Sequence, residues 1–289
     1  MKLAMESEYL VRRFGFEKAV QMLKEAGFDA VDFSFCGATG EAFLDENYRD
    51  TAKKIAEYMN AIGLECRQTH APFRFVYGED MDGSCLHYRE IERSIEFASI
   101  LGAKYIIIHS IKTPDDAEVV EYNLKYYKSF EHLCKKFNIQ IGVENLYWIE
   151  NIRTENEKYH GRFSKPQEMK DFIKKLDSEW LVVCLDTSHA AATGTKPEDF
   201  VAGMDSNMLK ALHVHDSDYK GDKHWLPFFG KHDWDAFMKN LAKIGYTGDL
   251  TYEVCAYTPS YDDELIPAAL EFAAKVGRYL IKKFVEEQN

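Results

Sequence analysis

Short runs of β-branched and aromatic residues alternate along the chain with longer segments in which apolar residues recur every three or four positions. The first pattern predicts buried strands, and the second predicts amphipathic helices. Eight strands are predicted, at residues 2–6, 30–35, 65–69, 105–109, 139–144, 181–186, 209–215 and 250–254. Eight helices are predicted, at residues 17–26, 48–62, 88–101, 117–137, 167–176, 197–204, 234–244 and 265–285.

Eight strands that alternate with eight helices are typical of a parallel sheet covered by helices, which belongs to the α/β class. For 289 residues we expect a closed (β/α)8 TIM barrel, with residues 1–289 as a single domain. An open doubly wound sheet is the alternative, but no G-x-G-x-x-G turn follows the first strand. The loops at 71–85, 145–165 and 216–233 are long and follow strands, so we expect them to cover the site of a barrel.

The chain has 36 Lys and Arg against 48 Asp and Glu, a formal net charge of −12. This balance argues against a protein that coats duplex DNA, because such binding requires cations that neutralise phosphates. Six scattered cysteines without a C-x-x-C motif are typical of reduced thiols in the cytoplasm. No apolar run approaches the ~20 residues of a membrane span, and acidic residues stand where a signal peptide is apolar. We therefore expect a cytoplasmic protein without a membrane segment.

Residue types that commonly bind metals stand at the ends of six predicted strands and in one following loop. They are His70, His109, Glu144, Asp186, His189, His213, His215, Asp222, His224 and Glu253. Because strand ends meet at the mouth of a barrel, these side chains are expected to converge there. Divalent ions bind carboxylate oxygen and imidazole nitrogen, and buried carboxylates repel one another unless a cation lies between them.

Each of these residues, taken singly, also fits a structural role, such as a hydrogen-bonded histidine or an aspartate that caps a turn. That explanation must hold for all of them at once, including Glu253 within the apolar run LTYEV. The remaining histidines are expected at the surface: His87, His132, His160 and His232.

Four motifs together resemble the xylose isomerase-like TIM-barrel superfamily over nearly the whole chain. They are VEN at Glu144, LDTSH ending at His189, HVHDSD starting at His213 and TYEV around Glu253. The superfamily includes sugar and sugar phosphate isomerases and epimerases, and the endonuclease IV group. The resemblance implies one divalent metal, Mn, Mg, Co or Zn, held by Glu144, Asp186, His213 and Glu253. His215 is the alternative to His213, and His213 is preferred because L-H-V-x-D-S matches the commoner family pattern.

The resemblance implies a metal-dependent isomerase or epimerase of a sugar, polyol or sugar phosphate that acts through an enediolate intermediate. Glu144 and Glu253 are the predicted acid/base pair. The predicted substrate contacts are His70, His109, Glu150, His189, His215 and His224. Barrels of this kind often pair, so a homodimer is an open expectation. The sequence leaves open the sugar, its phosphorylation, and the choice between isomerisation and epimerisation.

Two other functions are retained as alternatives. The set His70, His109, Glu144, Asp186, His189, His213, Asp222, His224 and Glu253 also resembles the trinuclear zinc set of endonuclease IV, a phosphodiesterase that acts on abasic DNA. The segments NLYWIENIRTENEKYHGR and LPFFGKHDW depart from the loops of those nucleases, and the acidic charge disfavours a nucleic-acid partner. A non-catalytic sugar-binding barrel is the second alternative.

Overall fold

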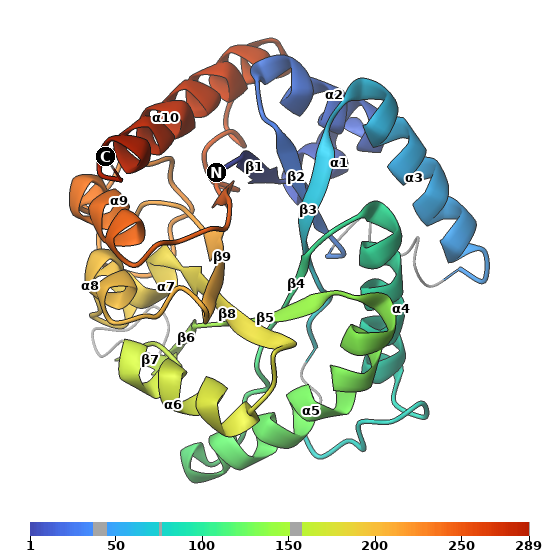
Figure 1. Ribbon diagram of the computed structural model, residues 1–289. Helices are drawn as coiled ribbons and strands as arrows, with labels where there is room; N and C mark the ends of the chain where they lie inside the picture. Colours follow the sequence, from blue (N-terminus) through green and yellow to red (C-terminus); the bar gives the residue numbers. More distant parts are fainter. Residues whose placement is uncertain (37–44, 75–76, 151–157, 289) are drawn as a thin grey trace. The chain divides into compact units, whose positions relative to one another are not determined.

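The computed structural model describes residues 1–36, 45–74, 77–150 and 158–288. The chain divides into two compact units. The N-terminal unit comprises Glu6–Val143 and Phe172–Val182, and the C-terminal unit comprises Met1–Met5, Glu144–Asp171 and Val183–Asn289. Strands and helices alternate along the chain in both units (Figure 1).

The N-terminal unit contains parallel strands that pair in chain order. They are β2 (Ala30–Ser34), β3 (Glu65–His70), β4 (Tyr105–Ile108) and β5 (Gln140–Glu144), the last of which ends at the unit boundary. The helices of this unit are α1 (Glu8–Phe14), α2 (Phe16–Ala26), α3 (Tyr48–Ile62), α4 (Leu86–Leu101) and α5 (Val119–Phe137), with a 3-10 turn, η2, at Asp116–Glu118. Helices α2, α3 and α4 each end at a glycine in the left-handed conformation, whose backbone N–H donates hydrogen bonds to carbonyl groups of the last helical turn.

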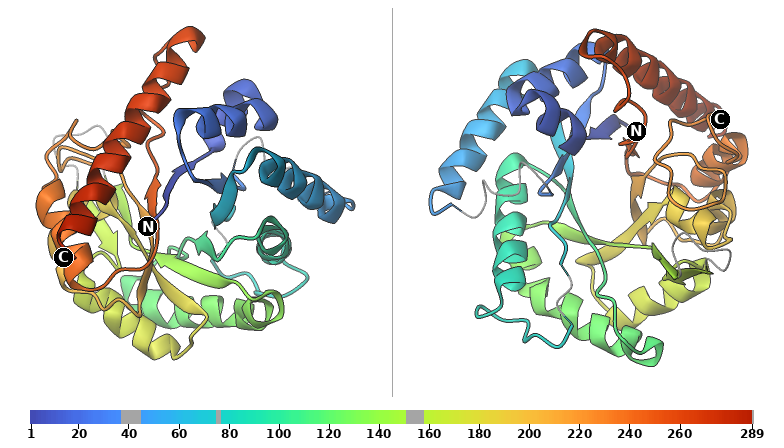
Figure 2. Two further views of the ribbon diagram at one scale, coloured as in Figure 1. Left: turned by 45° about the horizontal axis from the view of Figure 1, so that its top comes forward. Right: turned by 180° about the vertical axis from the view of Figure 1, so that it is seen from behind.

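The strands β8 (Leu181–Asp186), β9 (Leu209–His213), β10 (Leu250–Tyr252) and β1 (Leu3–Glu6) are also parallel. Strand β8 pairs with β9, a bridge joins Val214 to Tyr252 of β10, and β10 pairs with β1. The other elements are the hairpin β6 (Leu146–Glu150) and β7 (Lys158–Arg162), helices α6 (Pro166–Leu176), α7 (Thr187–Ala192), α8 (Pro197–Ala202), α9 (Trp234–Lys243) and α10 (Ile266–Glu286), and the 3-10 turn η3 (Asp263–Leu265). Helix α10 packs alongside α9 (Figure 2).

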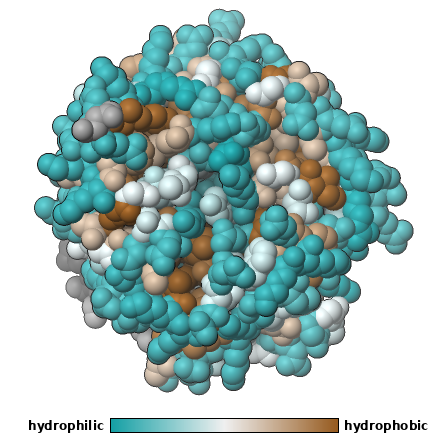
Figure 3. Space-filling model, viewed as in Figure 1, coloured by the Kyte–Doolittle hydropathy of each residue, from teal (hydrophilic) through white to brown (hydrophobic). Residues whose placement is uncertain are grey.

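Every residue of β1, β2 and β8 is buried, as expected for parallel strands covered on both faces. Hydrophilic side chains cover most of the face seen in Figure 3, and hydrophobic ones form separate patches. Among the described residues, no helix is both long and apolar enough to span a membrane.

The eight predicted strands and eight predicted helices all form, with bounds within two residues of those predicted. The helices α1 and α7, the turn η3 and the β6–β7 hairpin were not predicted, and the hairpin occupies the predicted loop at 145–165. The first strand of this hairpin, LYWIE, contains the aromatic and β-branched residues that favour strands. It directly follows another strand, so the segment was assigned to the loop before the next helix. Helix α7 starts directly after β8 because the Asp186 carboxylate caps it, accepting a hydrogen bond from the His189 N–H at 2.7 Å.

Candidate metal centre

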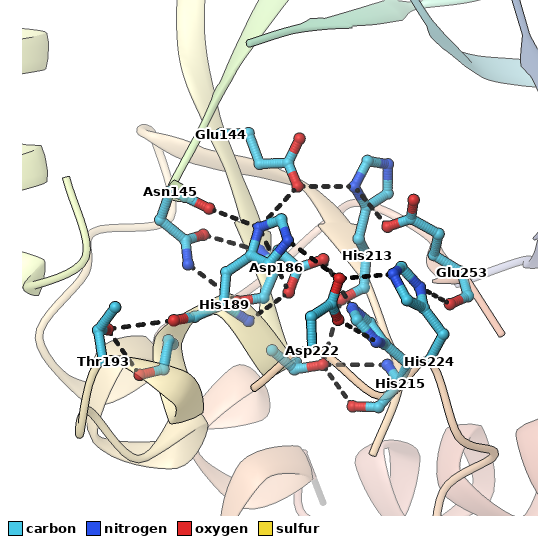
Figure 4. A network of polar contacts seen from close by, with 12 residues as sticks. Glu144, Asn145, Asp186, His189, Thr193, His213, His215, Asp222, His224 and Glu253 are labelled. Atoms are coloured by element: carbon cyan, nitrogen blue, oxygen red, sulfur yellow. Dashed lines mark hydrogen bonds and ion pairs between the residues drawn. The ribbon is translucent and has the colours of Figure 1, made fainter. Parts of the chain in front are cut away.

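Four of the predicted metal ligands converge in the structure (Figure 4). Glu144, Asp186 and His213 are the last residues of β5, β8 and β9, and Glu253 directly follows β10. One ligand atom from each of the four lies within 4.8 Å of the others. Strands that are distant in sequence therefore supply three carboxylates and one imidazole to one small, buried space.

The imidazole of His213 lies between two of these carboxylates. Its Nδ1 is 3.2 Å from Glu144 Oε1 and 3.2 Å from Glu253 Oε2. The side chain of His215 instead contacts Asp186, with Nε2 2.7 Å from Oδ2. The histidine of the four-residue group is therefore His213, whereas His215 groups with Asp186 and Asp222, and which histidine binds a metal stays a prediction.

The charges of this group fit a divalent cation. Burial raises the pKa of the Glu253 carboxyl, and the charges of Asp186 and Glu144 add to the increase, while His213 and His224 act in the opposite direction. Three carboxylates in a buried space repel one another, and a cation among them would remove that cost. Oxygen and imidazole donors in this ratio suit Zn, Mn, Co or Mg.

A second polar group surrounds Asp222 in the loop after β9. Asp222 Oδ2 lies 2.6 Å from His224 Nε2 and 3.4 Å from His189 Nε2, and Oδ1 lies 3.4 Å from His215 Nδ1. Within the described structure, Asp222 Oδ1 and His215 Nδ1 are buried and make no hydrogen bond. Burial lowers the pKa of His224, but its bond to Asp222 and the charge of Glu253 outweigh burial and raise it to about 10.

Asn145 follows Glu144 and was part of the VEN motif, but no role was predicted for it. Its amide accepts a hydrogen bond from the Asp186 N–H at 2.8 Å and donates one to the Asp186 carbonyl at 2.9 Å. Its own carbonyl oxygen is 2.9 Å from His189 Nδ1. Asn145 therefore fixes the position of Asp186 and the orientation of the His189 ring.

Two further predicted substrate contacts lie next to each other in the N-terminal unit. His70 ends β3 and His109 follows β4, both in the N-terminal unit, and their Nε2 atoms are 3.1 Å apart. The ring of Phe73 stacks on His109 with a centroid distance of 4.6 Å. The side chain of Glu150, at the end of β6, lies outside the described residues.

Asp216 organises the loop that carries Asp222 and His224. Its fully buried carboxylate accepts four hydrogen bonds of 2.8–3.2 Å, from the backbone N–H groups of Ser217, Phe228 and His232 and from the Trp234 indole. Gly230 passes so close that a Cβ there would overlap Asp216 Oδ1 and the Ser217 carbonyl oxygen. Asp216 is the aspartate of the L-H-V-x-D-S pattern that begins at Leu212, but no role was predicted for it.

The prediction that His232 and His87 are surface residues is wrong, because both are buried. His232 Nε2 lies 3.0 Å from Ser217 Oγ, beside Asp216. Burial lowers the pKa of His232 to about 4, so its imidazole is neutral in the loop. His132 is exposed as predicted, and the side chain of His160 lies outside the described residues.

Adding Zn²⁺ to metal-free protein at about pH 7 is expected to release protons. The bond to Asp222 and the charge of Glu253 raise the pKa of His224 to about 10, so the ring carries a proton at pH 7, and a cation bound at Glu253 would oppose that contribution and favour loss of the proton. The affinity of the four-residue group for the metal should therefore rise with pH. Calorimetry in buffers of different ionisation enthalpy measures the release. His224→Gln should reduce the number of protons released, whereas His132→Gln should leave this number unchanged. If His224→Gln did not change the proton release, the placement of the cation at Glu253 beside His224 would be contradicted.

The chain belongs to the xylose isomerase-like TIM barrel family, whose family model matches residues 20–276. A solved structure titled "D-tagatose 3-epimerase-like protein" matches 100% of both chains at 20% identity, with a TM-score of 0.74. The "IOLI protein with a binding zinc atom" matches 99% of both chains at 15% identity, with a TM-score of 0.74. These full-length similarities confirm the predicted fold, a single TIM-barrel domain.

A third relative bears on the alternative function. "Probable endonuclease 4" of Malacoplasma penetrans (strain HF-2) is 23% identical over 211 residues, which cover 68% of this chain and 70% of that protein.

Proposed function

We propose that this protein is a divalent-metal-dependent isomerase or epimerase of a small sugar or sugar phosphate. The observation that carries the proposal is the convergence of Glu144, Asp186, His213 and Glu253 from four strands onto one buried space. The full-length similarity to an epimerase-like protein and to a protein with a bound zinc atom supports both the reaction class and the metal.

In this mechanism Glu144, Asp186, His213 and Glu253 would hold the metal. When bound, the metal supplies Lewis-acid polarisation of a carbonyl group. Glu144 and Glu253 carry the proton transfers: one removes the proton next to the carbonyl, and an enediolate of the sugar forms. Return of a proton to the opposite face of the same carbon by the other glutamate gives epimerisation. Return by the same glutamate to the former carbonyl carbon, with transfer of the hydroxyl proton to the former carbonyl oxygen, gives isomerisation.

The histidines around Asp222 are proposed to bind substrate hydroxyl groups. His189, His215 and His224 lie around one carboxylate, so their rings are held in fixed orientations. His70, His109 and Glu150 stay predictions for the same role. A homodimer also stays a prediction. The prediction that residues 1–289 form a single domain would be supported by a single thermal unfolding transition.

Incubation with a panel of ketoses and ketose phosphates in D₂O is expected to place deuterium on one carbon of at least one sugar. The proton removed by a carboxylate exchanges with solvent before its return. Treatment with a chelator should abolish this exchange, and restoring the metal should recover it. NMR or mass spectrometry detects the label. No label on any sugar with metal-replete protein would favour the non-catalytic sugar-binding alternative.

An abasic-DNA phosphodiesterase is retained as the second candidate because the histidines around Asp222 form another group of metal-binding types. The Malacoplasma relative adds support. That function requires more than one metal ion per chain and nicking of DNA at abasic sites. Elemental analysis combined with a nicking assay separates it from the isomerase, for which one metal and no nicking are expected.

A further inference from the structure

A small cavity lies in the N-terminal unit, between the loops that follow β3 and β4. Its volume is about 170 Å³. One water molecule needs about 15 Å³, so the cavity has room for a group larger than water. Its lining includes Arg74 from the first loop, Ser110 and Lys112 from the second, and His87 from the first turn of α4. Among the described residues that line it, two are cationic and none is acidic. We call this cavity the Arg74 pocket.

Glu90 fixes the direction of the Arg74 guanidinium. Arg74 Nε and Nη2 each donate to this buried carboxylate at 2.6 Å, and the Arg74 side chain is otherwise 52% exposed. A guanidinium carries five N–H donors, so a two-bond fork leaves three for another acceptor. Because the fork already restricts the side chain, binding an anion costs little further conformational entropy.

His87 provides a buried donor on the wall of the pocket. The Tyr126 hydroxyl lies 2.9 Å from His87 Nε2, where a neutral hydroxyl can donate or accept a hydrogen bond. Burial lowers the pKa of His87, which favours the neutral ring, and in the tautomer whose Nε2 accepts from Tyr126 the single proton is on Nδ1. Within the described structure Nδ1 makes no hydrogen bond, and the carboxylate of Glu90 is 3.9 Å away. A buried N–H without an acceptor is costly, and an oxygen in the pocket would satisfy it.

We propose that the Arg74 pocket binds a phosphate-type oxyanion through Arg74, Lys112 and His87. The lining thus contains a guanidinium, an ammonium-bearing side chain and a buried imidazole, which together match the several acceptor oxygens of a phosphoryl group. His109, a predicted substrate contact, also lines the pocket, so the oxyanion is assigned to the phosphoryl group of a sugar phosphate. That last assignment rests on the proposed isomerase function, whereas binding of the oxyanion itself does not.

Calorimetric titration with inorganic phosphate tests the pocket without any turnover. The wild-type protein should bind phosphate, and Lys112→Ala should weaken binding about tenfold, as expected for loss of one charge-assisted hydrogen bond. The double variant Arg74→Gln, Glu90→Gln removes the guanidinium without leaving an unpaired buried charge and should lower affinity further. Lys125→Ala, an exposed lysine on α5, is the matched control. No binding to the wild type at about 10 mM phosphate, or equal binding by all variants, would overturn the proposal.

Competition identifies the source of the oxyanion. If inorganic phosphate inhibits exchange on a ketose phosphate competitively, and Lys112→Ala raises KM for that substrate but not for the unphosphorylated ketose, the pocket holds the substrate's phosphoryl group. If phosphate binds in the titration without affecting KM, the pocket is an oxyanion site and its assignment to the substrate is wrong. A protein that binds phosphate but turns over no sugar would disprove the isomerase function alone.

Discussion

Replacing Glu144 with Gln is expected to lower turnover by about 10²–10⁴-fold while the protein stays folded. The amide has nearly the same shape as the carboxylate, but it neither accepts a proton at neutral pH nor offers a charged ligand. Glu144 Oε1 lies 3.2 Å from His213 Nδ1, so the substitution acts at the centre of the four-residue group. Initial-rate kinetics on the best sugar of the panel give the effect, and circular dichroism checks folding.

Glu121→Gln provides the matched control, since this exposed glutamate lies in α5 and should retain full activity. Metal content separates the two roles proposed for Glu144. Loss of turnover with metal retained would indicate proton transfer, and loss of both would indicate that metal binding is the main role. A variant that keeps most of the wild-type turnover would contradict the assignment of Glu144 to the acid/base pair.

Replacing Asp216 with Ala is expected to lower the free energy of unfolding by about 3–5 kcal/mol, which corresponds to roughly 6–20 °C in Tm. Removal of the carboxylate leaves four N–H donors, among them that of Trp234, in a buried space without their acceptor. Asp216→Asn should also be destabilised, because its amide group would face two of these donors. Differential scanning calorimetry measures the change.

Asp218→Ala is the control for this substitution. Asp218 lies two residues away and accepts a hydrogen bond from the Lys220 N–H at 3.0 Å in a local turn, so its loss should cost less than about 1 kcal/mol. Asp216→Ala should in addition bind metal more weakly, because His224 in the loop that Asp216 holds contacts the backbone carbonyl oxygen of the proposed ligand Glu253 through Nδ1 at 2.8 Å. Wild-type stability in Asp216→Ala would show that the four hydrogen bonds do not hold the loop.

The roles of the two histidines in the HVH sequence show what sequence reasoning could not decide. His213 and His215 are two residues apart, so both are predicted on the same side of an extended strand. In the structure β9 ends at His213, and the two rings have different partners: His213 contacts Glu144 and Glu253, whereas His215 contacts Asp186 and Asp222. Those partners come from other strands and from a loop, and no local pattern identifies them.

The sequence by itself determined the order, type and approximate bounds of the strands and helices that form the barrel. The reason is that parallel strands buried on both faces require short continuous apolar runs, whereas amphipathic helices require an apolar residue about every 3.6 positions. It also determined that acids and histidines stand at strand ends. Only the tertiary structure decided which of these groups meet, that Asp216 holds the loop of Asp222, and that His87 is buried beside Arg74. Such contacts join residues far apart in the chain, so they depend on strand pairing and loop path rather than on local periodicity.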